Sequence, residues 1–443
     1  MKDDDNNDDE KPSLQPAAVA WNRMSNGQSH VEWAREDVRP FSIGQRLGKG
    51  GVGVVHETHI GGVSVALKLT STRRMDPQIL NEIKILGRMS QNRHRHVVEL
   101  IGSYVHEQQR GGYEIGMLIW PVAHTDLAAL LHDVNVLWQH YENDLTDDDD
   151  DVLQQPSSSV VEKVRTAMEP LLPFGYQNKH YRYRNLGHEV QSIMYAVCEN
   201  RLRHSLGCIA NAVAYLHTNR IRHKDLKPSQ ILLSPQGLWL TDFGWSADMS
   251  EHSTSVTSGG DQITAKYQAP ERANRQPCGR SEDIFSLGCI YLEIAYCMAR
   301  FGQDIPRPWL QKGWSFQANL NQVQEWMKPL GRPSWFADPK SDSRLVAVLI
   351  TELPVLLKPM LAAASNDRPS IQDIVDSLST PFVESIGATF TGECCAPLMR
   401  IENSSEESMS EDSDNEIGDT IAVMPYSQVS DVIAVMPREK AQS

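Results

Sequence analysis

The chain has 443 residues, 40% of them hydrophobic, which is enough for one large globular domain with flanking segments. Its net charge of −15 argues against a general nucleic-acid or membrane binder, because both functions need a positively charged surface. The seven cysteines show no CxxC spacing and the N-terminus lacks the apolar stretch of a signal peptide, so we expect a soluble protein of the cytoplasm or nucleus.

The N-terminal part of the chain divides into a polar segment and a series of strands. Residues 1–20 are polar and rich in Asp, and we expect residues 1–40 to be an acidic, largely disordered segment. Trp21 and Trp33 either pack on the edge of the fold or share this disorder, and the sequence leaves both alternatives open. From Phe41 onward, apolar and polar residues alternate with the period of two that is typical of β-strands. A helix begins at Asp76-Pro77, because Asp suits an N-cap and Pro the first helical position. The alternation predicts strands at residues 41–48, 52–60, 63–70, 97–105 and 113–120.

The middle of the chain contains a long segment without periodicity. Residues 133–195 include the acidic run Asp147–Asp151, and a loop of this length in a compact domain is usually an insert. The acidic run is either a solvated loop or a site for a basic partner. Helical periodicity returns at Leu202, and helical segments dominate from Ser281 to Leu378.

The C-terminal residues 383–443 are acidic and rich in Ser, and we expect a disordered tail. The sequence I-A-V-M-P occurs twice in this tail, within Asp419–Pro425 and Asp431–Pro437. The two copies are either docking segments for a partner protein or a duplication without function.

Two motifs in the predicted strands suggest a phosphate-binding site. Gly48, Gly50 and Gly53, followed by Val55, have the pattern G-x-G-x-x-G-x-V, which lets a backbone cover phosphate groups closely. A plain Gly-rich hairpin would have the same pattern. In the next strand Lys68 ends a V-A-x-K pattern. A buried Lys needs an anionic partner, such as a nucleotide phosphate or Glu82 on the following helix, whereas a solvated Lys needs none.

Three further motifs follow in chain order. Residues 223–230 read H-K-D-L-K-P-S-Q, residues 242–244 read D-F-G, and residues 269–271 read A-P-E. Together with the two earlier motifs, this ordered set resembles the signature of eukaryotic protein kinases of the serine/threonine type, and the tails resemble those of divergent fungal kinases. The resemblance covers residues 41–382. It implies the α+β, bilobal protein-kinase fold, with a small β-rich N-lobe at about 41–120 and a larger α-helical C-lobe at about 124–382.

The resemblance implies a role for each matching residue. Asp225 would orient the substrate hydroxyl and accept its proton, and Lys227 would neutralise charge on the transferred phosphoryl group. Lys68 would bind the α- and β-phosphates of ATP and pair with Glu82. Asp242 would hold Mg²⁺ against the β- and γ-phosphates. The implied cofactors are therefore ATP and Mg²⁺, and the implied partners are protein substrates with a hydroxyl group.

The resemblance also implies an adenine pocket beside the connection that follows the last small-lobe strand. Trp120 would lie at the back of this pocket, in the position called the gatekeeper. The carbonyl of Pro121 and the N–H of Ala123 would contact the base, and Asp126 would meet the ribose. The side chains that would enclose the adenine are Val55, Ala66 and Leu232.

Two residues depart from the family pattern. Lys224 replaces an Arg that in the family grips a phosphorylated activation loop, and Lys keeps the charge but loses the two-pronged geometry. Gln230 replaces the Asn that binds the second Mg²⁺, so the amide oxygen is carried on a longer side chain. We therefore expect an ATP-dependent protein serine/threonine kinase. The alternative is a catalytically weak or inactive pseudokinase that acts as a scaffold or binding protein.

Overall fold

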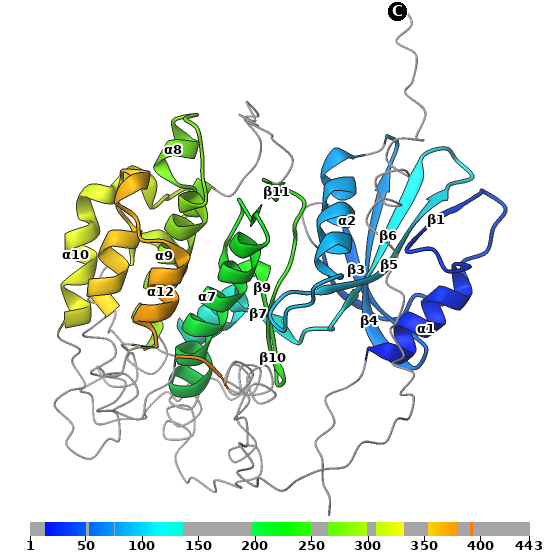
Figure 1. The fold of residues 1–443 in the computed structure, drawn as a ribbon, viewed down its shortest axis with the longest axis horizontal. Helices are drawn as coiled ribbons and strands as arrows, with labels where there is room; N and C mark the ends of the chain where they lie inside the picture. The colour runs from blue at the N-terminus through cyan, green and yellow to red at the C-terminus, as the bar shows by residue number, and fades with distance from the viewer. Residues whose placement is uncertain are drawn as a thin grey trace, which may run out of the picture.

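The protein has a small lobe built on a β-sheet and a larger, mainly helical lobe, as the computed structural model in Figure 1 shows. No helix among the described residues is long and apolar enough to cross a membrane. The residues that the structure describes are 14–49, 53–74, 76–135, 197–249, 265–298, 307–331, 353–379 and 390–392.

The small lobe is a six-stranded sheet with the order β1-β5-β6-β4-β3-β2. Its pairs are antiparallel except for β1, which runs parallel to β5. The predicted strands are confirmed, although the first is shorter than residues 41–48. The strands are β1 (His30–Trp33), β2 (Arg46–Lys49), β3 (Val54–Ile60), β4 (Val63–Thr72), β5 (Glu99–Glu107) and β6 (Tyr113–Trp120).

The predicted helix of the small lobe is α2 (Pro77–Met89). The Asp76 side chain accepts a hydrogen bond of 2.8 Å from the backbone N–H of Gln78 and so caps the helix, as the sequence predicted. The apolar face of α2 is buried against the face of the sheet that carries Met117 and Ile119. Glu82 therefore enters the interior from a helix whose start is fixed by its own sequence.

The prediction of a largely disordered segment at residues 1–40 is wrong for residues 14–40. These residues form helix α1 (Gln15–Met24) and strand β1, and α1 covers the face of the sheet opposite α2 (Figure 1). Trp21 is only 1% exposed and lies so close to Gly102 that a Cβ there would be 2.1 Å from the indole. The physical reason is that one large aromatic side chain buries enough apolar area to order a polar segment.

The large lobe is built around α9 (Ser281–Met298), whose side chains are almost all buried, and α7 (Arg203–Thr218). The confirmed fold class is therefore α+β, with helices in the second half of the chain. Further helical segments of the large lobe are the π-helix Val197–Leu202, α8 (Pro270–Ala273), the 3₁₀ segment Gln317–Gln322, α10 (Val323–Met327) and α12 (Ile371–Ser377). Short strands β7 (Thr125–Asp126), β8 (Ile221–Arg222), β9 (Ile231–Ser234), β10 (Gly237–Leu240) and β11 (Ala247–Asp248) lie at the junction with the small lobe.

The expected insert and tail lie mostly outside the described residues. Of residues 133–195 the structure describes 133–135, which continue a helix that starts at Leu127. Within 383–443 it describes residues 390–392, and these pack onto α7. Phe390 is 5% exposed, and its carbonyl accepts a 2.8 Å hydrogen bond from the N–H of Gly207. The prediction of disorder is therefore wrong for this short stretch, because Phe390 adds an apolar side chain to the large-lobe core.

Candidate active site

Three charged residues from both lobes meet at the junction between them. The Nζ atom of Lys68, on β4, lies 2.8 and 2.7 Å from the two carboxylate oxygens of Glu82 on α2. The same Nζ lies 3.5 Å from Oδ1 of Asp242, which follows β10. Glu82 lies 14 positions and Asp242 174 positions from Lys68 in the sequence, and the fold brings all three together. The pairing of Lys68 with Glu82 is the contact that the motifs predicted.

Lys68 is stabilised in its charged form by the two carboxylates, whereas burial and the nearby charge of Asp242 raise the pKa of Glu82. Burial by itself would lower the pKa of Lys68, but the carboxylates of Glu82 and Asp242 outweigh it and raise that pKa. Burial would likewise raise the pKa of Asp242, yet Lys68 and the Gln230 amide lower it. Lys68 is therefore a permanent ammonium and Asp242 a permanent carboxylate at neutral pH, which suits binding of phosphate and of a cation respectively.

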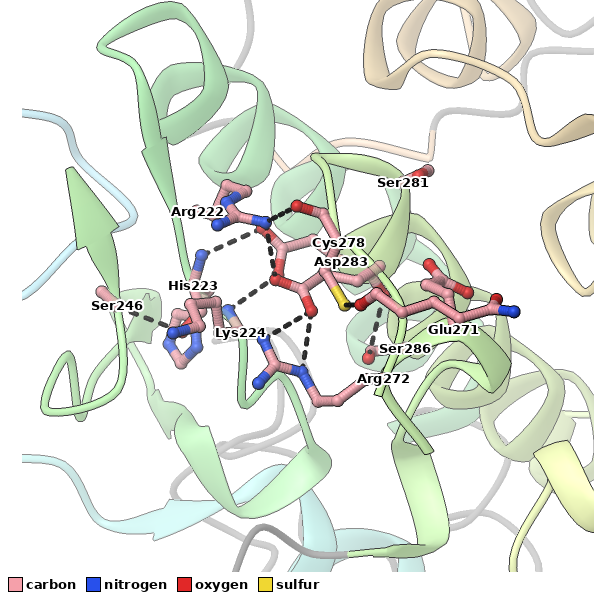
Figure 2. A network of polar contacts seen from close by, with 12 residues as sticks. Arg222, His223, Lys224, Ser246, Glu271, Arg272, Cys278, Ser281, Asp283 and Ser286 are labelled. Atoms are coloured by element: carbon pink, nitrogen blue, oxygen red, sulfur yellow. Dashed lines mark hydrogen bonds and ion pairs between the residues drawn. The ribbon is translucent and has the colours of Figure 1, made fainter. Parts of the chain in front are cut away.

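A second charged pair lies in residues 223–230, the H-K-D-L-K-P-S-Q motif, which is called the catalytic loop below. Nζ of Lys227 is 2.6 Å from Oδ2 of Asp225, and Asp225 is 7% exposed. Asp283, at the start of α9, holds this loop in place. Its carboxylate accepts hydrogen bonds from the backbone N–H groups of His223 at 2.9 Å and Lys224 at 2.8 Å, and Figure 2 shows these residues side by side.

Two residues of this site adopt backbone angles that side chains rarely take. Lys224 has a φ of 69° and Asp242 a φ of 64°. Such conformations cost roughly 1–3 kcal/mol each and persist only where the surroundings fix them. Asp283 supplies that fixation for Lys224, and Gln230 contacts Asp242 directly.

Gln230 lies beside Asp242, where the motif places a metal ligand. Its Nε2 donates a 2.8 Å hydrogen bond to Oδ2 of Asp242, and the side chain is buried. The amide oxygen and the carboxylate together offer the hard oxygen ligands that Mg²⁺ prefers. Among the described residues there is no cluster of three or more His, Cys, Asp or Glu side chains that could hold a metal.

The predicted adenine-contacting side chains come from both lobes. Val55 on β3, Ala66 on β4 and Leu232 on β9 are each only partly buried, unlike most apolar residues near them. Asp126 follows on β7, whose register pairs it with Leu232. Its Oδ1 accepts a 2.9 Å hydrogen bond from the N–H of Ala129, so this carboxylate also caps the helix that begins at Leu127.

The sheet register corrects the position assigned to Trp120. Ile119 pairs with Ala66, and Met117 pairs with Lys68, on adjacent antiparallel strands. Paired residues point to the same face, so Ile119 shares the face of the ammonium and of α2. Trp120 points to the opposite face, and its ring centroid is 6.4 Å from that of Trp239. The register therefore gives the position assigned to Trp120 to Ile119 instead.

The glycine-rich segment is described at Gly48 and Gly53, while Gly50 lies outside the described residues. A Cβ at Gly53 would lie 2.3 Å from the carbonyl oxygen of Leu69, so close packing of β4 requires glycine there. A Cβ at Gly48 would meet nothing within 4 Å. Among the described residues, no contact therefore requires glycine at position 48.

Sequence reasoning missed the side chain that links α2 to the segment after Asp242. Nδ2 of Asn81 donates to the carbonyl oxygens of Phe243, Gly244 and Ser246 at 3.3, 3.0 and 2.9 Å. Nothing in the motifs marked Asn81, although it directly precedes Glu82. These contacts fix the orientation of α2, and hence of Glu82, relative to Asp242.

Comparison with known proteins agrees with this geometry. Residues 180–379 match the family model of the protein kinase domain. The chain is 30% identical over 206 residues to the serine/threonine-protein kinase/endoribonuclease IRE1 of Oryza sativa subsp. japonica, a match that covers 43% of this chain and 22% of that protein. It is 42% identical over 105 residues to the serine/threonine-protein kinase Sgk1 of Homo sapiens, which covers 23% of this chain and 24% of that protein. The chain thus spans about a quarter of the length of the curated relatives it matches.

A β-rich small lobe, a helical large lobe and a Lys–Glu–Asp cluster between them define a protein of the kinase class. The match of residues 180–379 to the protein kinase domain and the serine/threonine kinases among its relatives support membership of the eukaryotic protein kinase family. The bilobal fold expected from the sequence is confirmed, and the family and its relatives support protein kinase function.

Proposed function

We propose that this protein is an ATP- and Mg²⁺-dependent serine/threonine kinase that transfers the γ-phosphate of ATP to hydroxyl groups of proteins. The observation that carries the proposal is the position of Lys68, which lies within 2.8 Å of Glu82 and 3.5 Å of Asp242. The ammonium of Lys68 thus lies between Glu82 of the small lobe and Asp242 of the large lobe. In this position it can bind phosphate without rearrangement. The names of the relatives, both serine/threonine kinases, support the choice of acceptor.

The proposed nucleotide contacts follow from this position. Lys68 binds the α- and β-phosphates, and the backbone of Gly48, Gly50 and Gly53 covers them. Asp242 and the amide oxygen of Gln230 hold Mg²⁺, which when bound neutralises charge on the phosphates. Val55, Ala66 and Leu232 enclose the adenine, and Asp126 uses its remaining carboxylate oxygen for the ribose.

The one-residue correction at Ile119 moves the proposed contacts of the base as well. With Ile119 at the back of the pocket, the carbonyl of Trp120 and the N–H of Val122 take the places that the sequence had assigned to Pro121 and Ala123. Pro121 then lies between the two contacts, where its missing N–H costs nothing.

Replacing Ile119 by Ala tests this register. The smaller side chain should make room for an ATP analogue with a benzyl group on N6. The variant should bind this analogue at least about tenfold more tightly than the unmodified protein does, the usual effect of removing a few methyl groups from an apolar pocket. Trp120→Ala, the matched control, should leave the analogue excluded, because Trp120 lies on the other face. A thermal shift with the analogue and Mg²⁺ measures binding. Admission of the analogue by Trp120→Ala alone would contradict the corrected register.

The proposed chemistry belongs to the catalytic loop. Asp225 orients the acceptor hydroxyl and takes its proton, and Lys227, whose ammonium is 2.6 Å from Asp225, neutralises charge on the phosphoryl group in transit. Phosphoryl transfer needs little more from a protein than positioning and electrostatic stabilisation. An assay that follows the labelled γ-phosphate of ATP into generic protein substrates, and into the chain itself, tests the proposal. No transfer at any Mg²⁺ concentration would defeat it.

We propose further that the kinase domain spans residues 41–382, with residues 14–40 and 390–392 packed onto it. The protein would act in the cytoplasm or nucleus on protein substrates, and the repeated I-A-V-M-P segments of the tail would serve as a docking site for a partner.

A second candidate function, a pseudokinase that binds partners without catalysis, is favoured by the contact of Gln230. Its amide nitrogen donates a hydrogen bond to Asp242, and a metal ion bound by Asp242 would have to compete with this hydrogen bond or displace it. A protein that shows neither transfer nor a thermal shift with ATP and Mg²⁺ would have this function instead.

Gln230→Asn separates the two candidates. If the protein is an enzyme, the shorter amide should place its oxygen better for the metal, raise turnover and lower the Mg²⁺ concentration for half-maximal rate. The gain should be about tenfold or less, which corresponds to about 1.4 kcal/mol or less of barrier. Rate against Mg²⁺ concentration measures both effects. If the protein is a pseudokinase, this single change should create no activity.

A further inference from the structure

A buried carboxylate next to the active site bridges two arginines. Glu282, in the first turn of α9, is 2% exposed. Its Oε2 lies 2.8 Å from Nε and 2.6 Å from Nη2 of Arg272, a two-pronged contact, and its Oε1 lies 3.3 Å from Nη1 of Arg222. Figure 2 shows Arg222 and Arg272 pointing toward the same region beside Asp283.

The two arginines belong to the segments on either side of the reacting groups. Arg222 ends β8 and directly precedes the catalytic loop that carries Asp225. Arg272 lies in α8, which follows residues 265–269. One small cavity is lined by Asp225 of the catalytic loop, by residues 267–269 and by Arg272 and Glu282, so these segments face each other directly. Glu282 therefore connects the loop that holds the proposed base to the segment opposite it.

The bridge also balances charge around the loop. Burial lowers the pKa of Lys224, and the nearby charge of Arg272 lowers it further, while Glu282 acts in the opposite direction. Lys224, Arg222 and Arg272 would repel each other in this interior without the carboxylate. Removing one partner from a buried charge group leaves the others uncompensated, which is among the costlier changes to a protein interior.

We propose that Glu282 is a positioning residue for phosphoryl transfer to protein substrates, acting through Arg222 and Arg272 to hold the catalytic loop against residues 265–269. Asp283, the next residue, fixes the backbone of the same loop, so two consecutive carboxylates of α9 secure it in different ways. The inference rests on the proposed function, because it assigns the positioning to that reaction. It concerns the protein substrate and not the nucleotide, since neither arginine contacts Lys68 or Asp242 in the described polar contacts.

The proposal has a consequence for control by phosphate. Lys224 stands where the family pattern has an Arg that grips a phosphorylated activation loop, and here the anion that binds the neighbouring arginines is part of the chain. The position of the catalytic loop should therefore not depend on a phosphate group. Treating the purified protein with a phosphatase should leave its rate of transfer within about twofold, a difference of about 0.4 kcal/mol in barrier.

The test is Glu282→Gln, which keeps the shape of the side chain and removes its charge. We expect turnover of a protein substrate to fall about tenfold to a hundredfold, as displacement of a catalytic group by a fraction of an ångström can cause. The KM for ATP and the thermal shift with ATP and Mg²⁺ should not change. Amide hydrogen exchange should become faster at residues 222–227 and 265–273, which reports the bridge independently of catalysis.

Two variants complete the experiment. Glu325→Gln is the matched control, because Glu325 is exposed and pairs only with Lys328 among its described contacts, and it should change nothing. Arg272→Lys keeps the charge but loses the two-pronged contact, so it should shift both readouts in the same direction by a smaller amount. If Glu282→Gln does not fold, Arg272→Lys tests the proposal in its place.

The outcomes separate this inference from the proposed function. Unchanged hydrogen exchange and unchanged turnover in Glu282→Gln would overturn the positioning role while the kinase activity stands. A large loss of activity after phosphatase treatment would mean that a phosphate holds the loop instead of Glu282, and would also overturn it. Absence of transfer by the unmodified protein would defeat the proposed function, and in that case unchanged hydrogen exchange in the variants would still refute the bridge.

Discussion

Replacing Asp225 by Asn should reduce phosphoryl transfer by roughly 10²–10⁴-fold, the usual contribution of a positioned general base. Asn has nearly the same size and can still contact Lys227, so the fold and the binding of ATP and Mg²⁺ should be preserved. Asn cannot accept the proton of the substrate hydroxyl, and this is the step we expect to lose. Incorporation of labelled phosphate into a protein substrate measures the effect, with thermal melting as a check on folding.

The matched control is Asp367→Asn, since Asp367 is an exposed Asp on the large lobe that belongs to none of the motifs. It should transfer phosphate at the rate of the unmodified protein. Equal turnover by Asp225→Asn and this control, with unchanged melting, would show that Asp225 is not the base. A loss of activity with a lowered melting temperature would instead indicate damage to the loop.

Replacing Trp21 by Ala should lower the free energy of unfolding of the small lobe by about 3–5 kcal/mol, as for other large aromatic side chains truncated in a core. The indole is 1% exposed, packs on Gly102 and donates a 3.1 Å hydrogen bond from Nε1 to the carbonyl of Gln28. Its loss removes apolar burial and also leaves that carbonyl without its donor. Chemical denaturation followed by circular dichroism measures the change.

Val19→Ala on the same helix is the control, because Val19 is 40% exposed and its truncation should cost little. If Trp21→Ala and Val19→Ala had the same small effect, helix α1 would contribute little to the stability of the lobe. The nucleotide affinity of Trp21→Ala, measured well below its melting temperature, should be unchanged, because the indole lies on the face of the sheet away from Lys68.

The strands of the small lobe and the start of α2 could be predicted because local signals determine them. Alternation of apolar residues marks a strand, and the Asp76–Pro77 pair marks a helix start, wherever the rest of the chain lies. Helix α1 and strand β1 could not be predicted in this way. Their order depends on Trp21 reaching the outer face of a sheet that is formed by residues much later in the chain.

The candidate site shows the same division. Motif order was sufficient to bring Lys68, Glu82 and Asp242 together, because each belongs to a short pattern. The assignment of Trp120 failed because a count of residues along one strand does not say which face a side chain occupies, and only the pairing with β4 does. The bridge through Glu282 was missed because its partners lie 60 and 10 residues away and no local pattern joins them.

The parallel pairing of β1 with β5 has a consequence for association between molecules. An unpaired edge strand presents free N–H and C=O groups to which another chain can add a strand. Without β1, the edge of the sheet would be β5, which has nine residues; with β1 it has only four. The opposite edge, β2, also has four residues. By ending its sheet in two short strands, the small lobe limits the length over which a second protein could extend it, and β1 thus protects the sheet from unwanted strand exchange.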